Sequence, residues 1–312
     1  MAEIQKWKIT EPYLETKCGL GEGPYYEASR NHIRFVDIKK HRLHVIDLNV
    51  GPSSLKTIQL DMPVGVTADI AGEDSSKKIL IGGKHGIAIL DRETEKYEYL
   101  QRYYDDKGRD DRLRSNDGAV DPQGRFWIGT MNDFHVGDPT PEGSLFRFDA
   151  DLSRHMMRDG LTIPNSVGWT KDQKKLFLVH SSEKEIWQYD FDGSTGNISN
   201  GKVWYKHDGE GEPDGHKMDE EGNLWQCVFN EGKVLKINPD GKVIGIVELP
   251  TRCTSCPCFV GTELWVTSAE EEEPDKYPES AKYGGAIFKI DVGVRGLKDF
   301  EFRLNPDAQR RA

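Results

Sequence analysis

The sequence lacks several features that would place it in other classes of protein. No apolar run approaches the roughly 20 residues that a membrane-spanning helix needs. Residues Met1 to Thr10 contain no apolar core of a signal peptide. Basic blocks are also missing, and the net charge of -11 disfavours nucleic acid and anionic membranes as partners. We therefore expect a cytoplasmic protein without nucleic-acid or membrane partners; protein partners stay unspecified.

Cysteine is scarce, and the five residues form no evident framework. An odd number argues against a set of disulfides. Cys253, Cys256 and Cys258 resemble the start of a zinc site, but a structural zinc usually needs four ligands in two pairs. The second pair is missing and no histidine lies close in sequence. We therefore predict reduced, mostly buried thiols.

Helical periodicity is also lacking, whereas short alternating runs between turn residues recur throughout. These runs fall into six similar units, each long enough for four strands. A fixed period of this kind indicates a repeat architecture, and sheets stacked radially as blades would bury the faces of all six units. The sequence predicts one all-β domain over residues 1–312, a six-bladed β-propeller with four-stranded blades. The alternative is a two-domain sandwich. The residues that open the six units are Glu22, a region near Val66, Asn116, Asn165, Asp214 and Thr254-Ser255.

The ends of the chain and two insertions complete this prediction. Either Lys6–Ile9 or Phe300–Leu304 is expected to complete the last blade, because a ring of blades must be closed. Two charged insertions cover residues 103–113 and 269–283. The first leads directly into Arg114, so it is either a lid or a solvated loop. The second is expected to be a solvated surface or a weak cation patch.

Polar residues recur at one phase of the repeat. Asn116, Asn165 and Asp214 are spaced 49 positions apart, and Glu22 stands at the corresponding place in the first unit. Around a common axis these residues would form a cluster of oxygen ligands, which suits Ca²⁺ or Mg²⁺, with Mn²⁺ or Zn²⁺ as alternatives. Taken singly, each residue is more typical of a turn than of a metal site. The equal spacing favours one divalent cation on the central axis.

At these residues the sequence resembles the senescence-marker-protein-30, gluconolactonase and luciferin-regenerating-enzyme family. The resemblance runs from about Cys18 to Gly296 and is carried by several short motifs together. They are Gly21-Glu22-Gly23-Pro24, Arg114-Ser115-Asn116-Asp117-Gly118, Gly129-Thr130-Met131, Pro164-Asn165-Ser166, Pro213-Asp214-Gly215, Thr254-Ser255-Cys256 and Gly284-Gly285-Ala286-Ile287-Phe288.

The resemblance implies a six-bladed propeller with one divalent cation, calcium among the candidates, bound by Glu22, Asn165 and Asp214. It implies that Asn116 borders the metal and the substrate and that Arg114 contacts the substrate. The activity implied is metal-dependent hydrolysis of sugar lactones, a carboxylic ester hydrolysis. In that mechanism a metal-activated water attacks the lactone carbonyl, and Asp214 is both ligand and general base.

The sequence departs from the family pattern at several places. Ser166, His180-Ser181, His216 and Trp225-Gln226-Cys227 replace more usual residues, which bears on the identity of the substrate more than on metal binding. Two alternatives remain: hydrolysis of organophosphates or other esters at the same metal, and a non-catalytic binding propeller. A serine hydrolase is disfavoured because no Gly-x-Ser-x-Gly motif is present.

Overall fold

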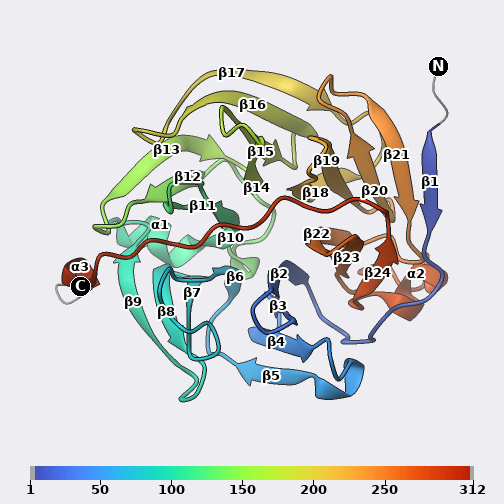
Figure 1. The fold of residues 1–312 in the computed structure, drawn as a ribbon, viewed down its shortest axis with the longest axis horizontal. Coiled ribbons are helices and arrows are strands. Elements are labelled where there is room, and N and C mark those ends of the chain that lie inside the picture. Colours follow the sequence, from blue (N-terminus) through green and yellow to red (C-terminus); the bar gives the residue numbers. More distant parts are fainter. Residues whose placement is uncertain (1–3, 310–312) are drawn as a thin grey trace. The chain divides into compact units, whose positions relative to one another are not determined.

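The computed structural model describes residues 4–309 and consists of six consecutive β-sheets (Figure 1). Apart from β1, which joins the fifth sheet, neighbouring strands in each sheet follow one another in chain order, so each repeat is an up-and-down meander. Six such sheets form the predicted six-bladed β-propeller, and each opening residue read from the sequence lies in the first strand of its repeat.

The first three sheets have four strands each. They comprise β2 (Gly21–Glu27), β3 (His32–Asp37), β4 (Arg42–Asp47) and β5 (Lys56–Gln59); β6 (Val64–Ala68), β7 (Lys78–Gly83), β8 (Gly86–Asp91) and β9 (Lys96–Arg102); and β10 (Leu113–Val120), β11 (Phe126–Asn132), β12 (Gly143–Phe148) and β13 (Arg154–Leu161).

The other three sheets have four, five and three strands. They comprise β14 (Pro164–Trp169), β15 (Lys175–His180), β16 (Glu185–Asp192) and β17 (Asn197–Lys206); β18 (Glu212–Met218), β19 (Leu224–Phe229), β20 (Lys233–Ile237) and β21 (Val243–Glu248) with β1 (Gln5–Lys8); and β22 (Thr254–Val260), β23 (Glu263–Ser268) and β24 (Phe288–Asp291). Helical segments are short: α1 (Lys107–Arg112), α2 (Pro278–Tyr283), α3 (Pro306–Gln309), η1 (Pro52–Ser54) and η2 (Phe134–Val136).

The predicted completion of the last blade is wrong for both ends of the chain. β1, which contains most of the predicted N-terminal run, pairs in parallel with β21 of the fifth sheet. Phe302, in the predicted C-terminal run, forms a parallel bridge with Ile70 beside the second sheet. The segment that hydrogen-bonds beside the sixth sheet is instead Tyr13 to Cys18, because its main chain pairs with Gly285 and Ile287.

The described residues also divide into two larger compact parts, which are called the first unit and the second unit from here on. The first unit contains the described residues up to Thr57 together with Lys184–Ile186 and Trp204–Lys298. The second unit contains Ile58–Glu183, Trp187–Val203 and the described residues from Asp299. The prediction of a single domain stays a prediction.

Two turns show how the sequence positions strands. Asp121 accepts hydrogen bonds from the amides of Gln123 and Arg125 and from Trp127 Nε1, the last at 3.1 Å. Asp219 in the fifth sheet does the same for its own turn and for Trp225 Nε1, at 2.9 Å. Gly124 and Gly222 occupy the left-handed region in these turns, with φ of 87° and 89°. The spacing Asp-x-x-Gly-x-x-Trp thus closes a hairpin and fixes a fully buried tryptophan.

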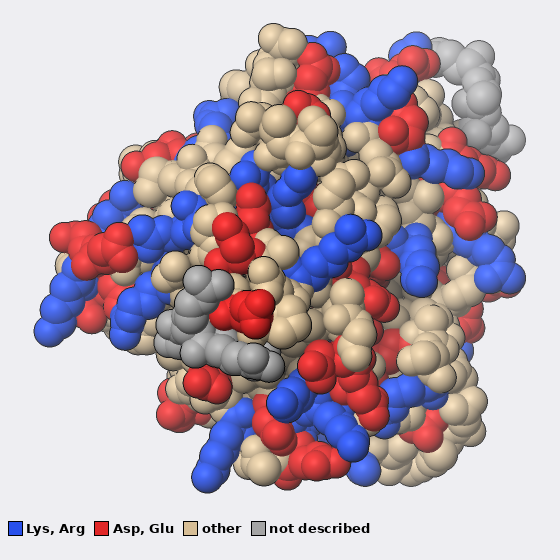
Figure 2. Space-filling model, turned by 60° about the vertical axis from the view of Figure 1, so that its left-hand side comes forward, with Lys and Arg blue, Asp and Glu red and all other residues tan. Residues whose placement is uncertain are grey.

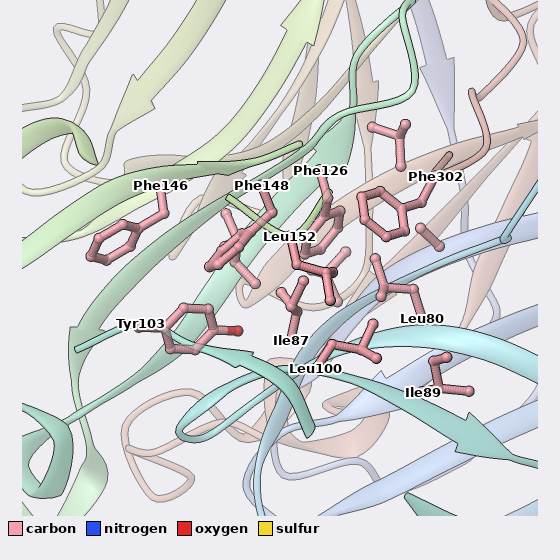
Figure 3. Packing of buried hydrophobic residues seen from close by; sticks show 14 of the residues in the cluster. Leu80, Ile87, Ile89, Leu100, Tyr103, Phe126, Phe146, Phe148, Leu152 and Phe302 are labelled. Atoms are coloured by element: carbon pink, nitrogen blue, oxygen red, sulfur yellow. The ribbon is translucent and has the colours of Figure 1, made fainter. Parts of the chain in front are cut away.

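Each unit has its own hydrophobic core. In the second unit, side chains of β6–β12 pack around aromatic residues, and Phe302 inserts from the C-terminal segment beside Phe126, with ring centroids 6.5 Å apart (Figure 3). In the first unit, Trp225 packs with Val266 and Phe288. Packing in these cores stabilises the sheets on which the candidate residues lie.

The surface carries charges of both signs. Figure 2 shows acidic and basic side chains intermixed on the face in view. Among the described residues, none of the helices has the length and apolar character to cross a membrane. The cytoplasmic location stays a prediction.

Candidate metal and substrate site

Each candidate ligand lies where the first strand of its sheet departs from regular pairing. The register shifts between Ser115 and Gly118 in β10, between Pro164 and Val167 in β14, and between Pro213 and His216 in β18. Asn116, Asn165 and Asp214 therefore lie inside irregular segments of the three strands. In β2 the shift begins directly after Glu22, which still pairs with Val36. Bulges re-aim side chains and are frequent next to functional sites.

In the first unit, β22 lies between the two strands that carry carboxylates. Ser255 Oγ donates a hydrogen bond to the carbonyl of Gly21, next to Glu22, at 2.5 Å. On the other side, Gly215, next to Asp214, lies so close to Cys256 that a Cβ on this glycine would overlap it. The absence of a side chain at Gly215 thus allows β18 to approach β22.

Glu22 and Asp214 both act electrostatically on one buried thiol. Each has 7% of its surface exposed, and Cys227 is fully buried. Burial raises the pKa of the Cys227 thiol well above its usual range, and the negative charges of Asp214 and Glu22 raise it further. Two buried carboxylates that act on one thiol also repel each other, which a divalent cation would relieve. The donor set, two carboxylates and no histidine, fits a hard cation.

Gln226 is a positioning residue that sequence reasoning recorded only as a departure from the family pattern. Its buried Nε2 donates to the carbonyls of Asp214 at 2.9 Å and Gly215 at 3.1 Å. These bonds fix the main chain on which the Asp214 carboxylate is mounted. The signal in the sequence was a glutamine within an otherwise apolar strand.

In the second unit, β10 takes the corresponding place between β6 and β14. Ser115 Oγ donates to the carbonyl of Gly82 at 2.7 Å and accepts from the amide of Gly65 at 3.2 Å. Asn116 Nδ2 donates to the carbonyl of Pro164, directly before Asn165, at 3.2 Å. The structure thus brings Asn116 next to the strand that carries Asn165.

Asn165 is buried, with 5% of its surface exposed, and its Nδ2 donates to Ser181 Oγ at 3.1 Å. With the amide nitrogen held by Ser181, the carbonyl oxygen lies on the opposite side of the carboxamide. A carboxamide oxygen is a ligand that Ca²⁺ and Mg²⁺ accept. Ser181 was noted in the sequence as part of His180-Ser181, without this role.

Arg114 is held in one position. It is 2% exposed, and its Nη1 donates to the carbonyl of Ser115 at 2.7 Å and to Asn116 Oδ1 at 3.2 Å. The guanidinium lies 4.4 Å from the ring centroid of Phe134, a residue that is 43% exposed. A cation fixed under an exposed aromatic ring is suited to bind an oxygen-rich ligand. Phe134 was not identified from the sequence.

We predict that Gly65→Ala destabilises the second unit. The added Cβ would overlap the carbonyl oxygen of Asn116, a main-chain atom that cannot rotate away. The free energy of unfolding should fall by about 1–3 kcal/mol, as is typical of overpacking. The matched control is Gly108→Ala in α1, where the nearest atom is Asp106 Oδ1 at 3.3 Å and alanine favours the helix. Equal urea midpoints for Gly65→Ala and the wild type would contradict this role.

His216 and His180, two of the departures from the family pattern, are both buried. Burial lowers the pKa of His216 to about 3, and Lys217 contributes in the same direction. His216 is therefore neutral near pH 7. His180 packs against Trp187, with ring centroids 5.6 Å apart.

The insertion before Arg114 is anchored to the third sheet. Asp106 caps α1 by accepting from the amide of Arg109 at 2.7 Å. Arg109 reaches Asp159 of β13 at 2.7 Å, and Arg112 forms a two-bonded pair with Glu142 at 2.9 and 2.6 Å. These contacts fix the segment that leads into β10. The lid role stays a prediction.

Glu231 holds the loop that precedes β18. Its Oε1 accepts from the Gly211 amide at 2.8 Å and contacts His207 Nε2 at 2.9 Å, and its Oε2 contacts Lys233 Nζ at 3.2 Å. Burial of the carboxyl raises its pKa, but these partners outweigh burial and lower the pKa to about 2 from 4.5. The charged carboxylate therefore stabilises the loop that leads to Asp214.

We predict that Glu231→Gln removes a pH-dependent contribution to stability. Because the pKa is lower in the folded state, the contribution is complete above about pH 4.5 and is lost as the pH falls toward 2. The variant should be less stable than the wild type by about 2–3 kcal/mol at pH 7, and this difference should shrink by about 2 kcal/mol at pH 3. Denaturant unfolding at both pH values measures it, with the exposed Glu248→Gln as control. A difference that is the same at both pH values would contradict it.

Comparison with known proteins shows which family the sequence matches. A family model described as "SMP-30/Gluconolactonase/LRE-like region" matches residues 20–270. The chain is 32% identical to regucalcin of Xenopus laevis, with 91% of this chain and 94% of that protein covered. It is 28% identical to pentonolactonase XacC of Haloferax volcanii, with coverage of 92% and 96%.

Solved structures show the same fold. A luciferin-regenerating enzyme is 28% identical with a TM-score of 0.83, covering 92% of this chain and 96% of that one. The calcium-binding protein regucalcin from Agrobacterium tumefaciens is 26% identical with a TM-score of 0.87, covering 96% and 99%. The chain therefore belongs to the SMP-30/gluconolactonase/LRE-like family.

Proposed function

We propose that this protein hydrolyses sugar lactones with the help of one divalent cation. The observation that carries the proposal is the pair of buried carboxylates, Glu22 and Asp214, which act together on the Cys227 thiol. Membership of a family that contains proteins named gluconolactonase supports the substrate class. A relative named pentonolactonase supports it independently.

We assign Glu22, Asp214 and Asn165 as the ligands of the cation. Their oxygen atoms favour Ca²⁺ or Mg²⁺, and Mn²⁺ or Zn²⁺ remain possible occupants. A bound divalent cation supplies a Lewis acid that polarises a carbonyl oxygen and lowers the pKa of water. The name of the calcium-binding relative from Agrobacterium tumefaciens supports calcium as the first ion to test.

The side chains around these ligands have separate tasks in the proposed reaction. The Asp214 carboxylate accepts a proton from the attacking water as general base, and Gln226 holds the main chain of Asp214 while it does so. The lactone ring opens as the bond between the carbonyl carbon and the ring oxygen breaks, and that oxygen takes up a proton. The product is a sugar acid with a new carboxylate.

Arg114 and Asn116 orient the substrate. Since Arg114 is fixed by its bonds to Ser115 and Asn116, it meets hydroxyl groups or the product carboxylate without a loss of side-chain freedom. Its permanent positive charge complements the acid that forms. Phe134 above the guanidinium adds an apolar face at the same place.

The experiment is a panel assay on protein that has been stripped with a chelator and reloaded with one metal at a time. Acid release is followed for hexono- and pentonolactones, a simple carboxylic ester and one organophosphate. Metal-dependent hydrolysis of a lactone, faster than that of the ester and the phosphotriester, is the expected result. Faster hydrolysis of the organophosphate would replace sugar lactones by organophosphates as the proposed substrate. No hydrolysis with any metal would favour the alternative of a non-catalytic binding propeller.

A further inference from the structure

A second group of potential metal ligands lies in the first sheet. Cys18 precedes β2, Asp37 ends β3 and His44 lies on β4. Each offers one ligand atom, and these three atoms lie within 4.8 Å of one another. The exposed fractions of Cys18, Asp37 and His44 are 1%, 1% and 3%. A thiol, a carboxylate and an imidazole thus converge in a fully buried place.

His44 has one ring nitrogen that its own surroundings do not use. Its Nδ1 contacts Thr57 Oγ1 of β5 at 2.9 Å, whereas Nε2 is buried and has no hydrogen-bond partner among the described residues. The ring stacks on Phe35 of β3, with centroids 5.0 Å apart, which holds its plane. Since Nδ1 is engaged by Thr57, Nε2 is the ring nitrogen left for the group formed with Cys18 and Asp37. A buried nitrogen without a partner is costly in an apolar interior and points to a missing ligand.

The other two residues are arranged to accept a cation. Asp37 is fixed by three amides, those of Gly19 at 2.9 Å, Leu20 at 3.1 Å and Lys40 at 3.1 Å, which leaves part of its carboxylate for another partner. Cys18 Sγ lies 3.4 Å from Thr16 Oγ1 and makes no disulfide. The negative charge of Asp37 also acts on the thiol.

We propose that Cys18, Asp37 and His44 form a second metal site that binds Zn²⁺ and is separate from the proposed lactone site. Sulfur and imidazole ligands select zinc over calcium or magnesium, and three protein ligands leave one position for water. On binding, Cys18 loses its thiol proton to solvent and its sulfur bonds to the metal. The thiolate and the Asp37 carboxylate together balance the two positive charges of the ion.

The site would link separate segments of the first unit. The amide of Cys18 donates to the carbonyl of Gly285, beside the sixth sheet, at 2.9 Å. An ion held by Cys18, Asp37 and His44 would tie this segment to β3 and β4. Because the ion would bind the folded chain through all three residues, zinc should raise the unfolding temperature of the chelated protein.

Cobalt titration of the chelated protein tests this site. Co²⁺ bound to a thiolate gives a sulfur-to-metal charge-transfer band in the near ultraviolet, whereas Co²⁺ bound to oxygen ligands alone does not. We expect this band to saturate at one ion per chain and to disappear when Zn²⁺ is added. Absence of the band in the folded wild-type protein would overturn the proposal.

Three variants locate the band. Cys18→Ser should abolish it, and His44→Gln should weaken cobalt binding at least about tenfold. Cys258→Ser makes the same chemical change at another buried thiol and should leave the band intact. Asp214→Ala should also retain it, so failure of the zinc site and failure of the lactone site are distinguishable. Persistence of the band in Cys18→Ser would place the metal on another cysteine and refute the assignment.

Discussion

Asp214→Ala is expected to abolish lactone hydrolysis, with a loss of about 10³-fold or more. The change removes a proposed metal ligand and the proposed general base together, and general-base catalysis alone accounts for about 10²–10⁴-fold. Because the base is lost, additional metal should not restore the rate. The neighbouring bonds from Gln226 go to main-chain carbonyls and do not depend on the Asp214 carboxylate.

The rate is measured by acid release over a range of metal concentrations. Asp208→Ala is the matched control, since it removes an exposed acid from the loop that precedes β18. It should retain the wild-type rate and metal affinity. Substantial hydrolysis by folded Asp214→Ala, at any metal concentration, would show that the base lies elsewhere.

Glu22→Gln is expected to weaken metal binding by about 100-fold, since ligand charge tunes the affinity of oxygen sites for cations. Glutamine keeps an oxygen ligand and the shape of the side chain, but removes one of the two buried negative charges. Hydrolysis should therefore be lost at low metal concentration and recovered at high concentration. Recovery at high metal concentration would show that Glu22 binds the cation without acting as the general base, in contrast to Asp214.

Calorimetric titration with Ca²⁺ gives the affinity, and the hydrolysis rate at saturating metal gives the catalytic contribution. Glu248→Gln, which removes an exposed acid of β21, should change neither quantity. An unchanged calcium affinity in Glu22→Gln would remove this residue from the ligand set. A rate that stays low at saturation would give Glu22 a second role.

Much of the fold could be predicted because the repeat is written in local patterns. Alternating apolar runs specify strands, and Asp-x-x-Gly-x-x-Trp specifies two of the turns through bonds within a few residues, as at Asp121 and Asp219. The ends could not be predicted in the same way. β1 pairs with β21, which lies far from it in the sequence, and Phe302 packs on Phe126. Both positions depend on tertiary contacts that no local sequence pattern contains.

The position of the candidate residues within their strands could be predicted, because residues at the same place in each repeat lie at the same place in each sheet. The even spacing of Asn116, Asn165 and Asp214 reflects a departure from regular pairing at one place in each first strand. Residues that support the site were not predictable from phase. Gln226 acts on the main chain of a neighbouring strand, and Phe134 reaches Arg114 from a short helical turn beyond β11.

The spacing of cysteines in the sequence did not indicate which of them has other potential ligands nearby. Cys253, Cys256 and Cys258 are spaced like the start of a zinc site, and the structure shows all three as buried free thiols. Among the described residues, Cys18 is the cysteine that forms a compact group with two other potential metal ligands, which come from two strands of the first sheet. The close spacing of the three cysteines in sequence thus did not identify the cysteine that lies beside other potential ligands.

The central claim is that a divalent cation held by oxygen ligands drives lactone hydrolysis. The most direct test is to titrate Ca²⁺ into chelated protein while hydrolysis and bound calcium are measured in the same sample. The account predicts that both rise together and reach a plateau at one calcium per chain. Full hydrolysis by protein without bound metal would contradict it.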